Sequence, residues 1–148
     1  MKSINKKITN KIKKMNYKVS MGNNTSHTFL TDPVRLGFTL SRYKFVAKMF
    51  EGFKDVLEVG AGEGFKSSIV GQFCKRLTLS DIEMENLKEY NRTKIKNYKF
   101  ILNDFVKKSI PKKFDGIYLL DVLEHINKKK ENLFLKNLKK CLKQNGTL

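Results

Sequence analysis

Three closely spaced glycines, Gly60, Gly62 and Gly64, follow a short apolar segment at residues 55–59. Glycine allows tight turns and lets the backbone approach a ligand, because no Cβ stands in the way. A ligand held at such a turn meets free backbone N–H groups where the next helix begins. The pattern therefore predicts a ligand-binding turn between a strand and a helix.

The spacing of the glycines disfavours two common nucleotide-binding motifs. A dinucleotide fingerprint needs G-x-G-x-x-G or G-x-G-x-x-A, whereas here Gly64 comes one residue early and Phe65 stands where a small residue is needed. A P-loop needs Gly-Lys followed by Ser or Thr, and the turn has no such sequence. Glu58, shortly before the first glycine, would repel a pyrophosphate and suits a ligand with a positively charged amino group.

Residues 58–64, Glu-Val-Gly-Ala-Gly-Glu-Gly, resemble motif I of class I S-adenosylmethionine-dependent methyltransferases. The resemblance implies a Rossmann-like sheet with strand order 3-2-1-4-5-7-6 and S-adenosylmethionine as the cofactor. It also implies that Glu58 anchors the amino group of the cofactor, directly or through water. The turn residues beside the cofactor would be Gly60, Ala61, Gly62 and Gly64.

Acidic residues stand where later strands end, and ligands of doubly wound sheets lie beyond those ends. Asp81 follows a strand predicted over residues 76–80, near the spacing at which an acid meets a ribose. A carboxylate can accept hydrogen bonds from two adjacent hydroxyls. The resemblance implies that Asp81 binds the ribose. Glu83 is an alternative ribose ligand, and a helix N-cap is the structural alternative for Asp81.

Asp104 and Phe105 follow the strand predicted over residues 98–102. The family often has an acid at this position that accepts a hydrogen bond from the adenine amino group. The resemblance therefore implies that Asp104 binds adenine and that Phe105 supplies its backbone N–H or packs on the ring. An ordinary loop acid is the alternative for Asp104.

Residues 114–126 resemble motif IV of small-molecule methyltransferases, among them the ubiquinone-biosynthesis O-methyltransferases, which carry a similar Leu-Glu-His. The resemblance places Leu120 and Asp121 beside the methionine half of the cofactor. The chain lacks the Asp/Asn-Pro-Pro-Tyr motif of DNA and protein N-methylases. We therefore predict methyl transfer to an oxygen of a small-molecule, saccharide or lipid-linked acceptor.

His125 has three interpretations. Its imidazole could act as a general base for an oxygen acceptor, which makes it the candidate catalytic residue. It could join Asp121 and Glu124 as a metal ligand, although such a site needs further ligands, and we predict none. It could also have a purely structural role in the loop after the fourth strand.

Alternating strands and helices must position these residues, and this alternation predicts an α/β fold with parallel strands and right-handed crossovers. The strands are predicted over residues 55–59, 76–80, 98–102 and 114–120. The helices are predicted over residues 33–50, 65–74, 83–94 and 129–143, with Asp32 as the first N-cap. These are about four strands of the seven that the family's sheet contains.

The predicted organisation is a basic extension and linker over residues 1–31 and a methyltransferase domain over residues 32–148, truncated before strand five. The chain could be a fragment, could pair with a chain that supplies more strands, or could be a binding or interaction module without methyl transfer. The edge of strand four would then be exposed and would invite self-association or a partner chain.

The net charge of +17 comes from 31 Lys and Arg against 14 Asp and Glu. Only four of the basic residues are Arg, the residue that best reads bases and grips phosphate, so a nucleic-acid partner is disfavoured. Abundant Lys, Asn and Ile together are typical of an AT-rich genome. Residues 1–18 contain seven Lys and no acid, which indicates either a solvated extension or an amphipathic arm in weak contact with an anionic membrane surface.

Cysteine usage and hydropathy favour a cytoplasmic protein. Cys74 and Cys141 are too few for a disulfide scaffold and fit a reducing compartment. The first residues have no apolar segment followed by a small-residue cleavage site. No apolar run approaches the roughly 20 residues of a membrane-spanning helix.

Overall fold

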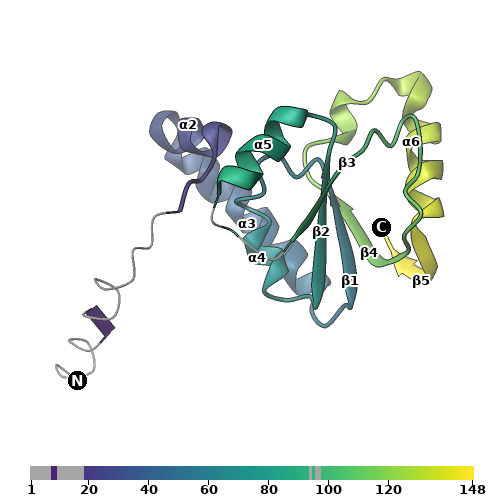
Figure 1. Cartoon of the computed structure of the whole chain (residues 1–148), viewed down its shortest axis with the longest axis horizontal. Coiled ribbons are helices and arrows are strands. Elements are labelled where there is room, and N and C mark those ends of the chain that lie inside the picture. Colours follow the sequence, from purple (N-terminus) through teal and green to yellow (C-terminus); the bar gives the residue numbers. More distant parts are fainter. Residues whose placement is uncertain (1–7, 10–18, 94, 96–97) are drawn as a thin grey trace.

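The computed structural model describes residues 8–9, 19–93, 95 and 98–148, and this part of the chain contains one parallel sheet with helices on both faces (Figure 1). The strands are β1 (Asp55–Val59), β2 (Arg76–Asp81), β3 (Lys99–Leu102), β4 (Phe114–Leu119) and β5 (Leu142–Thr147). They lie in the order β3-β2-β1-β4-β5, and every neighbouring pair is parallel. The predicted α/β, Rossmann-like class is confirmed, and this order agrees with the one that the resemblance implies.

The helices divide between the two faces of the sheet. They are α2 (Asn23–Thr31), α3 (Pro33–Met49), α4 (Ser68–Gly71), α5 (Met84–Arg92), the short 3₁₀ helix η1 (Leu123–His125) and α6 (Lys128–Lys140). Apolar residues of α3, α4 and α5 belong to one core, and those of α6 belong to the other. None of the helices in the described residues has the length and apolar character needed to cross a membrane.

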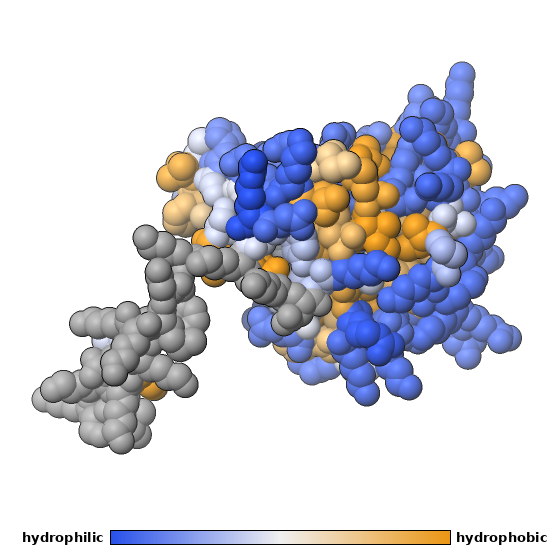
Figure 2. All heavy atoms as spheres, viewed as in Figure 1, coloured by the Kyte–Doolittle hydropathy of each residue, from blue (hydrophilic) through white to orange (hydrophobic). Residues whose placement is uncertain are grey.

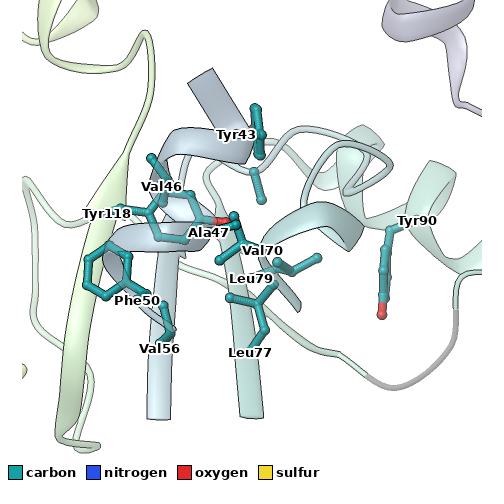
Figure 3. Packing of buried hydrophobic residues seen from close by; sticks show 11 residues of the cluster. Tyr43, Val46, Ala47, Phe50, Val56, Val70, Leu77, Leu79, Tyr90 and Tyr118 are labelled. Carbon is teal, nitrogen blue, oxygen red and sulfur yellow. The ribbon is translucent and has the colours of Figure 1, made fainter. Parts of the chain in front are cut away.

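Strand β1 is buried along its whole length, since β2 and β4 flank it and helices cover both faces. Successive side chains of a strand point to opposite faces, so β1 contributes to both cores. Val56 belongs to the core that contains Ala47 and Phe50 at the inner side of α3 (Figure 3). Leu57 belongs to the core that contains Leu138 of α6.

The molecular surface is mostly polar. Figure 2 shows hydrophilic residues around a central band of hydrophobic residues on one face. The predicted amphipathic arm at residues 1–18 lies outside the described residues, apart from Ile8 and Thr9.

Helix α3 begins as the sequence predicts. The side chain of Asp32 accepts a hydrogen bond from the backbone N–H of Arg35 at 2.9 Å, and Pro33 occupies the first turn. Proline suits this position because its missing N–H would have no partner within the helix.

The segment before α3 corrects the prediction of a linker, because residues 23–31 form helix α2. The polar composition that indicated a loop is offset by a distant contact: the backbone N–H of Thr25 donates to the carboxylate of Glu63 at 2.6 Å. Helix α2 also packs on α3. The proposed division between residues 31 and 32 as a domain boundary stays a prediction.

The C-terminal region corrects a second prediction. The last helix ends at Lys140, and Leu142–Thr147 forms a fifth strand, so the domain is not truncated before strand five. The backbone N–H of Phe114 donates to the carbonyl of Cys141 at 2.8 Å and starts the β4–β5 pairing. Strand β5 therefore pairs with β4 from Phe114 to Gly116, and the predicted self-association or partner chain at this edge stays a prediction. Helix α4 is also shorter than the predicted helix at 65–74.

A cluster of ion pairs lies at the amino ends of the strands, opposite the glycine-rich turn. The Asp55 carboxylate binds Nη2 of Arg76 at 2.6 Å and Nζ of Lys112 at 3.3 Å. The Asp115 carboxylate binds Nζ of Lys143 at 2.9 Å and accepts the backbone N–H of Asp55 at 2.8 Å. These cations lower the pKa values of Asp55 and Asp115, the largest cause being the hydrogen bond from Arg76 for Asp55 and from Lys143 for Asp115.

Asp55→Asn is expected to reduce the free energy of unfolding by about 1–2 kcal/mol at neutral pH, because Arg76 and Lys112 lose a charged acceptor. Since the folded-state pKa of Asp55 is lowered, its stabilisation is present above the unfolded pKa of about 3.9 and is lost as pH falls through the folded-state pKa. Thermal unfolding of wild type and variant at about pH 7 and about pH 2.5 should show a smaller difference in acid. Glu85→Gln, which removes an exposed pair with Lys88, is the control and should have little effect.

Candidate functional site

A cavity of about 700 Å³ lies at the carboxyl ends of the parallel strands. This is the edge where ligands bind in doubly wound sheets. Most of the residues singled out from the sequence line it, namely Gly60, Gly62, Asp81, Asp104, Phe105, Asp121 and His125. Ala61, Gly64, Glu58 and Leu120 do not line it. Residues that the sequence analysis missed include Asn24, Ile82 and Asn103.

The glycine-rich turn has the backbone geometry that its sequence predicts. Gly60 and Gly62 have φ values of 75° and 57°, a region that favours glycine. A Cβ on Gly60 would collide with Val122, whereas a Cβ on Gly62 would meet no atom within 4 Å. Gly60 therefore lets the turn pack against the loop after β4, and Gly62 leaves open space beside the cavity.

Asp81 supports this turn from the end of β2. Its Oδ2 accepts the backbone N–H of Gly62 at 2.9 Å, and its Oδ1 accepts the backbone N–H of Glu83 at 2.9 Å. The residue is buried, yet it lines the cavity. Each carboxylate oxygen has a further lone pair, so Asp81 can cap the following turn and still accept hydrogen bonds from a ligand. Glu83 does not line the cavity.

The end of β3 contributes the next part of the lining. Asp104 accepts the backbone N–H of Val106 at 2.8 Å, and a third of its side chain is exposed. Phe105 is buried, and its carbonyl accepts a hydrogen bond from the Asn137 side chain at 2.9 Å. The neighbouring Asn103 donates its backbone N–H to the Asp81 carbonyl at 2.9 Å. These bonds fix the loop, and Asp104, whose Oδ2 also lies 3.5 Å from Nζ of Lys107, lines the cavity.

Glu58 lies behind the turn instead of in the cavity. Its side chain is fully buried, and its carboxylate accepts hydrogen bonds from Tyr43 at 2.7 Å and Tyr118 at 2.6 Å. Burial raises the pKa of Glu58 and also raises the pKa values of both tyrosines, so the hydroxyls remain protonated donors. Glu58 does not line the cavity, so these bonds show it positioning α3 and β4, and its anchoring of the cofactor amino group, directly or through water, stays a prediction.

The loop after β4 carries a strained residue. Asp121 has φ 56°, which is unusual for a residue with a side chain and is common at binding sites. Arg42 of α3 donates to both of its carboxylate oxygens, at 2.5 and 2.7 Å, and this bond lowers the pKa of Asp121. Leu120 lines a different cavity, beside α3. Two adjacent residues thus face two separate spaces.

His125 is exposed in η1 and lines the cavity at the same edge. Among the residues that the structure describes, no group of three or more His, Cys, Asp or Glu side chains is arranged to hold a metal ion. Asp121, one of the candidate ligands, is bound by Arg42. The roles of His125 as a base or as a structural residue both fit this position.

Glu63 is a functional candidate that sequence analysis missed. The residue is buried, and its carboxylate binds the first turn of α2 through the Thr25 N–H at 2.6 Å and the Asn24 side chain at 3.4 Å. Since Asn24 also lines the cavity, Glu63 fixes α2 beside the site. The sequence did show an acidic residue between two glycines. Its partner, Thr25, lies 38 positions away, so no local pattern could have indicated the contact.

Comparisons with known proteins agree with the observed fold. A family model described as a methyltransferase domain matches residues 57–148. A search of curated proteins gave no match.

Solved structures show the same fold at low sequence identity. An S-adenosylmethionine-dependent methyltransferase from Clostridium acetobutylicum ATCC 824 is 21% identical with a TM-score of 0.70, over 84% of this chain and 54% of that one. DhpI in its SAM–HEP complex is 20% identical with a TM-score of 0.68, over 83% and 56%. The N-methyltransferase NodS from Bradyrhizobium japonicum WM9 is 21% identical with a TM-score of 0.64, over 78% and 66%. The chain thus spans roughly half to two thirds of the length of these relatives.

Glu63→Ala is expected to loosen α2, because the Thr25 N–H loses its buried acceptor. Amide hydrogen exchange within residues 23–31 should become roughly tenfold faster, while exchange in β1 stays unchanged. Mass spectrometry of deuterated peptides measures both. Glu51→Ala removes an exposed carboxylate near the end of α3 and is the control. Unchanged exchange in α2 would show that Glu63 does not hold this helix.

Proposed function

Because the chain belongs to the methyltransferase-domain family that its residues 57–148 match, we propose that it binds S-adenosylmethionine and transfers the methyl group to an oxygen of a small-molecule acceptor. The observation that carries this proposal is the pairing of the glycine-rich turn with Asp81 at the edge of one cavity. The acceptor classes are free small molecules, saccharides and lipid-linked molecules.

The cavity residues fit the parts of the cofactor. Asp81 is proposed to bind the two ribose hydroxyls with its remaining lone pairs. Asp104 is proposed to accept from the adenine amino group, with Phe105 beside it. The open space at Gly62 leaves room for the methionine portion near the turn. Ala61, Gly64 and Leu120 do not line the cavity, and their contacts with the cofactor stay predictions.

S-adenosylmethionine held by Asp81, Asp104 and the glycine-rich turn would supply an activated methyl group to the acceptor oxygen. The chain's own contribution is to orient the two molecules and exclude water. A ring nitrogen of His125 is proposed to take the proton from an acceptor hydroxyl. The Arg42–Asp121 pair fixes the loop that carries His125.

Asp81→Ala is expected to weaken binding of S-adenosylmethionine at least tenfold, because each charge-assisted hydrogen bond contributes roughly 1.5–3 kcal/mol. Isothermal calorimetry with S-adenosylmethionine and S-adenosylhomocysteine measures the affinity, and thermal unfolding checks that the variant folds. Glu83→Ala, the neighbouring acid outside the cavity, should bind normally. An unchanged affinity in Asp81→Ala would refute the ribose assignment.

His125→Ala is expected to keep the affinity for S-adenosylmethionine within about twofold and to slow methyl transfer roughly 100-fold, the usual range for a lost general base. Transfer of labelled methyl from S-adenosylmethionine into a pool of small-molecule extracts provides the readout. A normal rate in His125→Ala would assign this residue a structural role. Cofactor binding without any transfer by the wild-type chain would instead favour a binding module.

A further inference from the structure

A second cavity, of about 740 Å³, runs along the outer side of α3 and shares no lining residue with the cofactor cavity. We call it the α3 groove, and its apolar lining is Val34, Phe38, Phe45, Val46 and Leu120. Phe38 and Phe45 are 70% and 67% exposed, which is unusual for two phenylalanines on one helix face. The groove therefore offers an apolar surface large enough for a small molecule.

The α3 groove meets the cofactor cavity at one point. Leu120 lines the groove, and the next residue, Asp121, lines the cofactor cavity. Arg42 lines the groove and donates to both carboxylate oxygens of Asp121. The Arg42–Asp121 ion pair therefore lies at the boundary between the two spaces. Methyl transfer requires the reacting atoms to approach to about 3 Å, so an acceptor bound in the groove must extend past this boundary.

The charged residues that line the groove differ in whether their side chains already have a partner in the structure. Asp32 caps α3, and Arg42 is occupied by Asp121. The guanidinium of Arg35 has no hydrogen-bond or ion-pair partner among the described residues. Arg35 lines the groove, and its charge contributes to lowering the pKa of Asp121, after the larger effects of Arg42 and Lys66. Helix α3 itself contains no acidic residue, and the acid that shares the groove lining is Asp32.

We propose that the α3 groove is the acceptor site and that the acceptor is an apolar small molecule carrying an anionic group, which Arg35 binds. Phe38 and Phe45 contact its apolar body, and its methyl-accepting end extends past Leu120 and Asp121 into the cofactor cavity, which His125 lines. The inference rests on the proposed function, since it assigns the second substrate of that reaction. The preference of the α3 groove for an anionic ligand comes from Arg35, and its preference for an apolar ligand comes from Phe38 and Phe45.

Three matched probes test the inference in the presence of saturating S-adenosylhomocysteine: 4-phenylbutyrate, 4-phenylbutanol and 4-phenylbutylamine. Two-dimensional NMR titration of the full chain should show 4-phenylbutyrate shifting amide signals of residues 34–46 and 120. Its affinity should exceed that of the neutral and cationic probes at least fivefold. Calorimetry should show that the probe leaves the affinity for S-adenosylhomocysteine unchanged.

Substitutions test the charge of Arg35 and the apolar side chain of Phe38 separately. Arg35→Gln should remove the preference for the anionic probe, and Lys44→Gln, which removes a charge elsewhere on α3, should keep it. Phe38→Ser should weaken binding of all three probes at least fivefold, and Phe29→Ser, on α2, should not. Equal binding of the three probes, or an unchanged preference in Arg35→Gln, would overturn the inference.

Other occupants of the α3 groove would give distinct results, each of which overturns the inference. Sedimentation with phosphatidylglycerol vesicles that depends on Phe38 would assign the face to a membrane surface. A dimer that dissociates in Phe38→Ser would assign it to a second copy. Calorimetry with S-adenosylhomocysteine alone, before any probe is added, tests the proposed function separately. Failure of the wild-type chain to bind it would refute the proposed function, whereas binding of it together with equal affinities for the three probes would overturn only the acceptor assignment.

Discussion

The buried carboxylate of Glu58 is the interaction on which the rest of the structure depends. A buried acid is costly unless hydrogen-bond donors satisfy it, and here Tyr43 and Tyr118 donate to its two oxygens. The three residues belong to β1, α3 and β4, so satisfying one carboxylate fixes the helix against the centre of the sheet. The turn that follows β1 and the loop that follows β4 therefore begin from fixed positions.

The two cavities follow from this arrangement. Because α3 is held over β1 and β4, Arg42 reaches Asp121, and this ion pair stabilises the left-handed backbone of the loop after β4. The loop then directs Leu120 toward the α3 groove and Asp121 toward the cofactor cavity. On the other side of β1, Asp81 binds the backbone of Gly62 and sets the shape of the turn. Strand ends, not a separate loop domain, supply most of the site.

Sequence analysis succeeded where the signal is local. Glycines with positive φ occur where the spacing placed them, and the Asp32–Pro33 start of α3 is confirmed. It failed for segments whose structure depends on a contact with residues far away in the sequence. Helix α2 forms against Glu63, and residues 142–147 join the sheet because β4 offers an edge to pair with. Sequence also cannot show that two tyrosines donate to the carboxylate of Glu58.

The sequence by itself determined the fold class, the strand order implied by its family resemblance and the residues at the strand ends. The fold class and the residues at the strand ends depend on apolar alternation, glycine conformation and helix capping, which act between residues close in the chain, whereas the strand order came from the resemblance alone. Only the tertiary structure decided which acids face the cavity, which are buried, and that Arg42 separates two spaces. Those outcomes rest on hydrogen bonds between residues as many as 79 positions apart, and no local pattern encodes such a partner.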